Sequence, residues 1–221
     1  MPKAKSKKSR DKIIELSMEY LAQHGFDANL ADLCKAKKIK KAQFKEEFES
    51  IDNFEQFVWS EMMRSAITTA QGDAQFANFS KREKLLSLYY LFFENCGLNS
   101  DFLNESIRHH GKTGMLSVLK VLKEEFIAFI GSLHQLSLPL GKQYENSLNK
   151  LSDTVVGEAF YGQLLLLLDF WSNDSSSEHE KTDIAIEKTV KASMDILDVT
   201  PVKSVLDFAK FFWQERLSKS I

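Results

Sequence analysis

Proline is the residue whose placement most limits what this chain can fold into. The three prolines of the 221-residue chain stand at Pro2, Pro139 and Pro201. Because proline removes a backbone donor and clashes with the preceding helical turn, residues 3–138 are free of the strongest helix breaker. No window alternates apolar and polar residues between turn dipeptides, as a half-buried strand would. The sequence therefore predicts an all-α protein.

Glycines and polar runs divide this chain into helices. Breaks are expected at Gly25 and Gly72 and at the segments 97–100, 111–114, 137–141 and 172–178, which gives about nine or ten helices. Thr200 and Pro201 supply a cap and a first-turn proline for a last helix. A long helix is predicted from Gln143 to Trp171, and its second half is apolar on nearly every side. That helix is expected to be central or to form an interface.

Composition favours a soluble protein of the reducing cytoplasm. Apolar residues make up 43% and charged residues 27% of the chain, as in ordinary globular proteins. Cys34 and Cys96 lie far apart and without metal-binding spacing, so neither a disulfide nor a zinc site is expected. The longest nearly apolar stretch, residues 159–171, is too short to cross a bilayer. No apolar run follows the lysine-rich N-terminus, so no secretory signal is expected.

Charge is distributed unevenly. Residues 1–48 hold 12 basic and 7 acidic side chains, whereas the other 173 residues hold 17 basic and 24 acidic ones. Lysines gather at positions 3–8 and again at 35–45. This basic segment is an electrostatic footprint for a polyanion. The simpler alternative is a solubilising tail followed by a solvated lysine face.

The basic segment also has the spacing of three short helices. Its apolar positions are Ile13, Leu16, Tyr20 and Leu21 in the first helix, Leu30, Leu33 and Cys34 in the second, and Phe44 and Phe48 in the third. Gly25 closes the first helix, and Asn29 is a plausible N-cap for the second. Three short helices with a tight turn between the last two are the plan of a helix-turn-helix domain.

On these residues the chain resembles the TetR family of bacterial transcriptional regulators, over residues 10–58 by motif and beyond by helix number and length. The family's glycine-aromatic pair falls on Gly25-Phe26, its helix cap on Asn29, its Ile-Ala pair on Leu33-Cys34, its turn valine on Ile39 and its closing aromatic on Phe48. The positions that face DNA depart from the family pattern. They carry Lys37-Lys38 for Ala-Gly, Lys45 for a tyrosine, Glu47 for a histidine or tyrosine, and Ile51 for a lysine.

The resemblance implies a division into a disordered basic arm (1–9), a DNA-binding helix-turn-helix domain (10–52) and a helical effector-binding and dimerisation domain (53–221). The predicted DNA-binding residues are Asn29, Lys38, Lys40, Lys41, Gln43 and Lys45. Lysines can reach phosphates, and a glutamine can pair with adenine in the major groove. Glu46 and Glu47 would repel phosphates if they faced DNA, and the sequence leaves the orientation of this helix open.

The C-terminal part is expected to sense a ligand and to dimerise. Of the 25 aromatic residues of the chain, 18 lie within residues 76–221, and an aromatic-rich helical core can enclose an apolar ligand. The candidate pocket residues are Tyr89, Phe93, Phe126, Phe129, Phe160 and Tyr161. The alternative is that these rings are ordinary core. The resemblance implies a homodimer through about residues 155–170 and 183–197. The leucine run 164–168 is more apolar than one buried stripe requires.

The predicted function is a TetR-like repressor that binds double-stranded DNA and is modulated by an apolar small-molecule or lipid effector. The alternative is a lipid-binding or isoprenoid-binding protein of TetR fold that has lost DNA binding, because Phe170-Trp171, Asp174-Ser175 and Thr182-Asp183 are similar to a lipid binder of ubiquinone biosynthesis. The aromatic and basic last helix would suit a membrane surface. No enzyme, cofactor or metal is expected, because the adjacent His109 and His110 would point apart on a helix, the other histidines are isolated, and no phosphate loop or serine elbow occurs.

Overall fold

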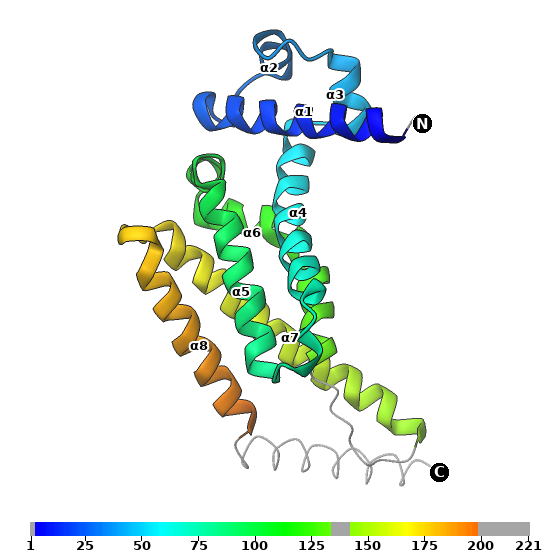
Figure 1. Cartoon of the computed structure of the whole chain (residues 1–221), viewed down its shortest axis with the longest axis vertical. Coiled ribbons are helices and arrows are strands. Elements are labelled where there is room, and N and C mark those ends of the chain that lie inside the picture. The colour runs from blue at the N-terminus through cyan, green and yellow to red at the C-terminus, as the bar shows by residue number, and fades with distance from the viewer. Residues whose placement is uncertain (1–2, 134–141, 199–221) are drawn as a thin grey trace. The chain divides into compact units, whose positions relative to one another are not determined.

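The computed structural model describes residues 3–133 and 142–198, and within them it is built from helices (Figure 1). The α-helices are α1 (Lys3–His24), α2 (Leu30–Ala36), α3 (Lys41–Glu47), α4 (Ile51–Gly72), α5 (Lys81–Leu98), α6 (Ser100–Leu133), α7 (Lys142–Ser172) and α8 (Glu180–Asp198). Two short 3-10 turns, Phe76–Asn78 and Ser177–His179, precede α5 and α8. The all-α prediction is confirmed. The predicted break at 137–141 and the helix after Thr200 lie outside the described residues.

The chain forms two compact units. Unit 1 consists of Met1–Thr68 and Leu91–Glu125, and unit 2 consists of Thr69–Tyr90 and Phe126–Ile221. The helices α4, α5 and α6 contribute residues to both units. The expected domain division after residue 52 stays a prediction. Helix α1 begins at Lys3, inside the stretch for which a disordered arm is expected, and residues 3–9 hold no glycine or proline to interrupt it.

In unit 1, the helices α1, α2 and α3 form the predicted helix-turn-helix head (Figure 1). Helix α1 ends at His24, and Gly25 then adopts a φ of 79°, the left-handed conformation that favours glycine at a helix end. The Asn29 side chain caps α2 by accepting a hydrogen bond of 2.8 Å from the Ala31 amide. These two local signals place the boundaries of α1 and α2 where the sequence predicts them.

Aromatic rings tie the head to α4 and α6. The Phe48 ring lies 5.0 Å from the Phe54 ring of α4, which in turn lies 6.1 Å from the Phe102 ring of α6, both edge to face. Phe44 completes the cluster, with its ring 5.9 Å from that of Phe54. All four side chains are buried. Such ring pairs add about 0.5–1.5 kcal/mol each to the free energy of burial, so α3 is held firmly on α4.

Helix α6 bends where the sequence predicts a break. Gly111 has a φ of 60° and a ψ of 178° inside the otherwise continuous helix. A residue with a Cβ would be strained in this backbone conformation. The expected break at 111–114 is therefore a kink at Gly111, with helix on both sides.

In unit 2, α7 and α8 pack along each other, and α7 also packs against the second half of α6. Gly157 of α7 is buried, and a Cβ at this position would lie 2.8 Å from Cγ2 of Ile127 of α6. The missing side chain thus allows α7 to approach α6 closely. Further along α7, one face buries Leu164, Leu168 and Trp171, while α8 buries Ile186.

A carboxylate clasps the connection between α7 and α8. Asp174 Oδ1 accepts hydrogen bonds from the amide and hydroxyl of Ser176 at 2.9 and 2.6 Å. Asp174 Oδ2 accepts from the amide and hydroxyl of Thr182 at 2.9 and 2.7 Å. Four donors, led by the Ser176 hydroxyl, hold the pKa of Asp174 well below its ordinary value. Beside the clasp, the buried Trp171 ring lies 5.4 Å from the His179 ring.

Replacing Asp174 with asparagine is expected to lower the melting temperature at pH 7, because the charged form accepts all four bonds best. A carboxyl group whose pKa is depressed by folding stabilises the protein above its unfolded pKa, about 4, and loses that effect as the pH falls through the folded value. The difference from the parent protein should therefore shrink on acidification below about pH 4. Thermal unfolding followed by circular dichroism at several pH values measures this difference in melting temperature. The control is Asp195→Asn, at an exposed position of α8. An unchanged melting temperature at pH 7 would contradict the role of the clasp.

Candidate nucleic-acid interface

The burial of two phenylalanines fixes the orientation of α3, which the sequence leaves open. Phe44 is fully buried and Phe48 nearly so. Since an α-helix turns 100° per residue, the face opposite these rings carries Ala42, Gln43 and Glu46, with Lys45 beside them. All four are exposed. The candidate base-reading surface is therefore this face of α3.

Glu47 is turned away from that face. Its carboxylate Oε2 lies 3.0 Å from Nε of Arg10 of α1 in an ion pair. The Arg10 guanidinium also lies over the Phe57 ring of α4, 4.8 Å from the ring centre. Arg10 thus connects α1, the end of α3 and α4, and it compensates the charge of Glu47. This pairing reduces the repulsion that Glu47 would exert on a nearby phosphate.

The two lysines of the turn between α2 and α3 have different environments. Lys37 is largely buried and pairs with Glu19 of α1, with Nζ 2.7 Å from Oε2. Lys38 is exposed and has a φ of 55°, in the left-handed region. This is the position where the family pattern has glycine. A side chain in this conformation costs roughly 1–2 kcal/mol.

The remaining predicted lysines are exposed. Lys40 precedes α3 as its N-cap residue in extended backbone, and Lys41 and Lys45 lie on α3. None of them forms an ion pair or side-chain hydrogen bond with the described residues. The predicted residues Lys38, Lys40, Lys41, Gln43 and Lys45, which are neighbours in the sequence, are thus all exposed, whereas Ile39 and Phe44 between them are buried. Asn29 differs from them, because its side-chain oxygen is occupied in capping α2.

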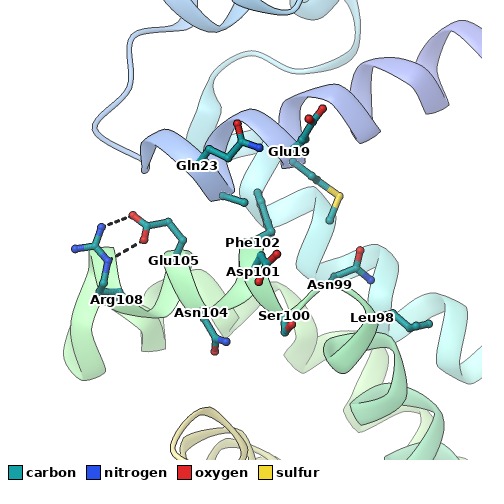
Figure 2. A pocket seen from close by; sticks show the side chains of 12 residues that line it. Glu19, Gln23, Leu98, Asn99, Ser100, Asp101, Phe102, Asn104, Glu105 and Arg108 are labelled. Carbon is teal, nitrogen blue, oxygen red and sulfur yellow. Dashed lines mark hydrogen bonds and ion pairs between the residues drawn. The ribbon is translucent and has the colours of Figure 1, made fainter. Parts of the chain in front are cut away.

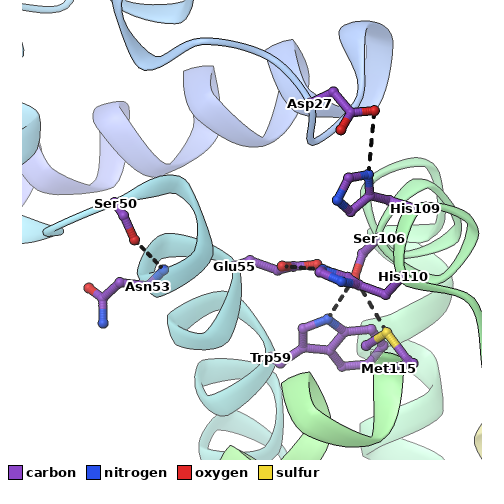
Figure 3. A network of polar contacts seen from close by, with 9 residues as sticks. All are labelled: Asp27, Ser50, Asn53, Glu55, Trp59, Ser106, His109, His110 and Met115. Carbon is purple, nitrogen blue, oxygen red and sulfur yellow. Dashed lines mark hydrogen bonds and ion pairs between the residues drawn. The ribbon is translucent and has the colours of Figure 1, made fainter. Parts of the chain in front are cut away.

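A buried polar network beneath the head went unrecognised in the sequence (Figure 3). Glu55 of α4 is only 1% exposed. Its Oε2 lies 2.8 Å from Nε2 of His110, and its Oε1 accepts a hydrogen bond of 2.5 Å from the hydroxyl of Ser106, both on α6. The Ser106 oxygen accepts in turn from the indole of Trp59 at 3.2 Å. The sequence signal that could have revealed this network is an acidic residue, Glu55, next to the buried apolar residues of α4.

The same segment of α6 contacts the loop between α1 and α2. Nδ1 of His109 lies 3.7 Å from Oδ2 of Asp27 (Figure 3), and the Phe26 ring lies 5.9 Å from that of His109. Asp27 is almost fully exposed, so its pairing with His109 contributes little. Phe26 is buried and supplies the packing. Together with the Glu55 network, this contact joins the head to α6 just before the kink at Gly111.

The predicted pocket residues are all buried, and five of the six belong to unit 2. The exception is Phe93, which lies in unit 1. In unit 2, the Tyr89 ring lies 6.0 Å from that of Phe126, and the Tyr89 hydroxyl donates to Oε1 of Gln163 at 3.3 Å. Burial raises the pKa of Tyr89, so this side chain is neutral. A ligand-binding role for these residues stays a prediction.

The predicted dimer segments carry exposed apolar side chains. Leu166 and Phe170 of α7 are 62% and 44% exposed, and Ile184 and Ile196 of α8 are 51% and 59% exposed. Large apolar side chains grouped on neighbouring helices are typical of interaction surfaces. The residues that suggest a lipid binder have a different setting, since Trp171, Asp174 and Thr182 pack or hydrogen-bond within the clasp. Within the described chain, every helix is too short or too polar to span a bilayer.

The fold and this head define a class, that of all-helical proteins with an N-terminal helix-turn-helix head. Comparison with known families agrees, because residues 84–212 match the family described as tetracyclin repressor-like, C-terminal domain. This match covers more than half of the chain. The chain therefore belongs to the tetracycline repressor-like (TetR) family of regulators. No curated protein matches it.

Glu55→Ala is expected to lower the free energy of unfolding by about 3 kcal/mol, because it leaves the buried Ser106 hydroxyl and the His110 ring without their acceptor. Glu55→Gln retains a hydrogen-bonding side chain and should cost less. Urea unfolding followed by circular dichroism at 222 nm measures both. The exposed Glu124→Ala of α6 is the control. Equal stability of Glu55→Ala and Glu124→Ala would show that the network does not stabilise unit 1.

Proposed function

We propose that this chain is a DNA-binding transcriptional repressor that reads its operator with α3. The observation that carries the proposal is the separation of charge in the head. The carboxylates of Glu19 and Glu47 are paired with Lys37 and Arg10, whereas the lysines of the segment 38–45 are exposed and unpaired within the described residues. A row of exposed cations on a helix-turn-helix head suits the phosphates of a duplex.

The outward side chains of α3 suggest how the sequence would be read. Lys40, Lys41 and Lys45 would contact phosphates and set the register of the head on the duplex. Gln43 can pair with adenine through two hydrogen bonds, and Glu46 can accept a hydrogen bond from the amino group of cytosine. Because a carboxylate is repelled by phosphate, Glu46 disfavours non-specific binding and favours a matching base.

A homodimer would present two such heads. The exposed apolar side chains of α7 and α8 support a dimer surface on unit 2. A twofold dimer pairs the same patch on both subunits, and its recognition helices reach half-sites one helical turn apart, about 34–36 Å. The operator would then be a palindrome.

The effector would bind among the aromatic residues of unit 2. This region combines buried rings, such as Phe126 and Phe160, with the polar pair of Tyr89 and Gln163. The side-chain nitrogen of Gln163 is buried and has no hydrogen-bond partner within the described residues. An unmet donor among apolar side chains suits an apolar ligand that carries one acceptor oxygen. Such a ligand would release DNA by changing the separation of the two heads through α4.

The triple variant Lys40→Ala, Lys41→Ala, Lys45→Ala tests the DNA face. It should bind DNA more weakly at every sequence, and the slope of log K against log salt should fall by about one per lysine that contacts a phosphate. The parent protein first selects fragments from a genomic library at two salt concentrations, and the bound fragments are sequenced. The affinity of the parent protein and of the variant for these fragments is then measured over a range of salt concentrations. A charge-matched control replaces the exposed Lys81, Arg82 and Lys120. An unchanged affinity and slope, or no sequence enriched by the parent protein, would favour the lipid-binding alternative.

Leu166→Glu combined with Ile184→Glu tests the dimer. Because both side chains are exposed in the single chain, the double variant should fold normally and yet fail to dimerise. Light scattering should give twice the 25.3 kDa chain mass for the parent protein and the single mass for the variant. Leu116→Glu, an exposed leucine of unit 1, is the control. A parent protein that is monomeric at micromolar concentration would exclude the dimer.

A further inference from the structure

A groove in unit 1 lies outside both the candidate DNA face and the predicted aromatic pocket (Figure 2). It runs between residues 18–23 of α1 and residues 98–108 at the end of α5 and the start of α6, and we name it the α1–α6 groove. Its volume is about 450 Å³. Bound small molecules occupy pockets of about 300–1,000 Å³, so this groove is large enough for one.

The floor of the α1–α6 groove is apolar. Met18 and Ala22 of α1 and the buried Phe102 of α6 form it. Leu98, the last residue of α5, stands at the rim and is 78% exposed, more than any other large apolar side chain in the described chain. An apolar molecule in the groove would cover this leucine and gain free energy from the water that it displaces.

The walls of the groove carry more negative than positive charge. Three carboxylates line it, those of Glu19, Asp101 and Glu105, against one cation, Arg108. Arg108 donates to both oxygens of Glu105, at 2.8 and 2.5 Å (Figure 2), and these bonds hold the pKa of Glu105 below its ordinary value.

The other two carboxylates differ in how they are compensated. Glu19 is paired with Lys37, which lies outside the lining. Asp101 is exposed and forms neither an ion pair nor a side-chain hydrogen bond with the described residues. Within the described chain, its charge is offset only by the positive end of the α6 dipole, because Asp101 lies in the first turn of that helix. This carboxylate would repel an anionic ligand, and a neutral ligand would leave it without a counter-ion. A cation with an apolar body would satisfy both the floor and the wall.

We propose that the α1–α6 groove binds an organic cation with an apolar body, such as an alkylammonium ion. Its alkyl part lies on Met18, Phe102 and Leu98, and its charged group lies beside Asp101. Volume, apolar floor and charge complementarity together specify this class of ligand.

This site would give the head a second ligand besides the effector of unit 2. The groove joins α1, which holds the end of α3 through Arg10 and Glu47, to α6, which holds Glu55 of α4. An occupant that touches both walls would restrain the head. A cation bound there would therefore change DNA affinity without entering unit 2.

The test is isothermal titration of the full chain, without DNA, with hexyltrimethylammonium chloride, 1-hexanol and heptanoate. The cation should bind at least tenfold more tightly than the other two, which have the same alkyl chain. Asp101→Asn should weaken cation binding about fivefold, as expected for one carboxylate near the surface. Leu98→Ser should weaken it as well. Both side chains are exposed, so neither change should disturb folding.

The exposed Asp195→Asn of α8 is the matched control and should bind the cation as the parent does. Three results would each overturn the proposal. They are hexanol binding as tightly as the cation, an unchanged affinity in Asp101→Asn, and no binding at about 10 mM cation, ten times a dissociation constant of about 1 mM. Because the titration contains no DNA, its result is independent of whether the head binds an operator. A parent protein that binds the cation and no DNA would support the groove and exclude the repressor.

Discussion

The buried carboxylate of Glu55 is the constraint on which the arrangement of unit 1 depends. A carboxyl group at 1% exposure is tolerated only when other groups replace its water, and here Ser106 and His110 of α6 do so. This requirement makes the contact between α4 and α6 specific, whereas apolar packing alone would permit sliding. The neighbouring Phe54 then receives the rings of α3. The position of α3 on α4 therefore depends on a polar contact between α4 and α6, which Glu55 makes one residue after Phe54.

Ion pairs, and not the amino-acid composition alone, determine which charges of the head are compensated. Glu47 of α3 is paired with Arg10 of α1, and Glu19 of α1 is paired with Lys37, so the charges of both carboxylates are compensated within the head. The chain has a net charge of −2, and yet the segment from Lys38 to Lys45 carries four exposed lysines and no carboxylate, with the exposed Glu46 directly after it. The net charge of a chain is thus a poor guide to the electrostatic field at one surface. Paired charges largely cancel each other's field, whereas exposed and unpaired charges do not.

The sequence predicts this fold well because most of its signals are local. Gly25 and Asn29 mark helix ends through their own backbone and side-chain chemistry, and the proline-free stretch leaves helix as the default. The site was harder to predict because its contacts are distant. Glu55 meets residues 51 and 55 positions away, so no local pattern announces it. The clasp residue Asp174 resembled part of a lipid binder, although its four bonds close a turn between helices.

Lys38 shows most directly how this head differs from the pattern of its family. Glycine would adopt its left-handed conformation without strain, whereas lysine costs roughly 1–2 kcal/mol there. Packing does not repay that cost, because the side chain is exposed and has no partner among the described residues. What lysine adds is a cation at the start of the exposed row that continues through Lys40 and Lys41. A residue that weakens the turn and strengthens only the local field is consistent with the proposed function, because a duplex against α3 would place its phosphates beside the turn.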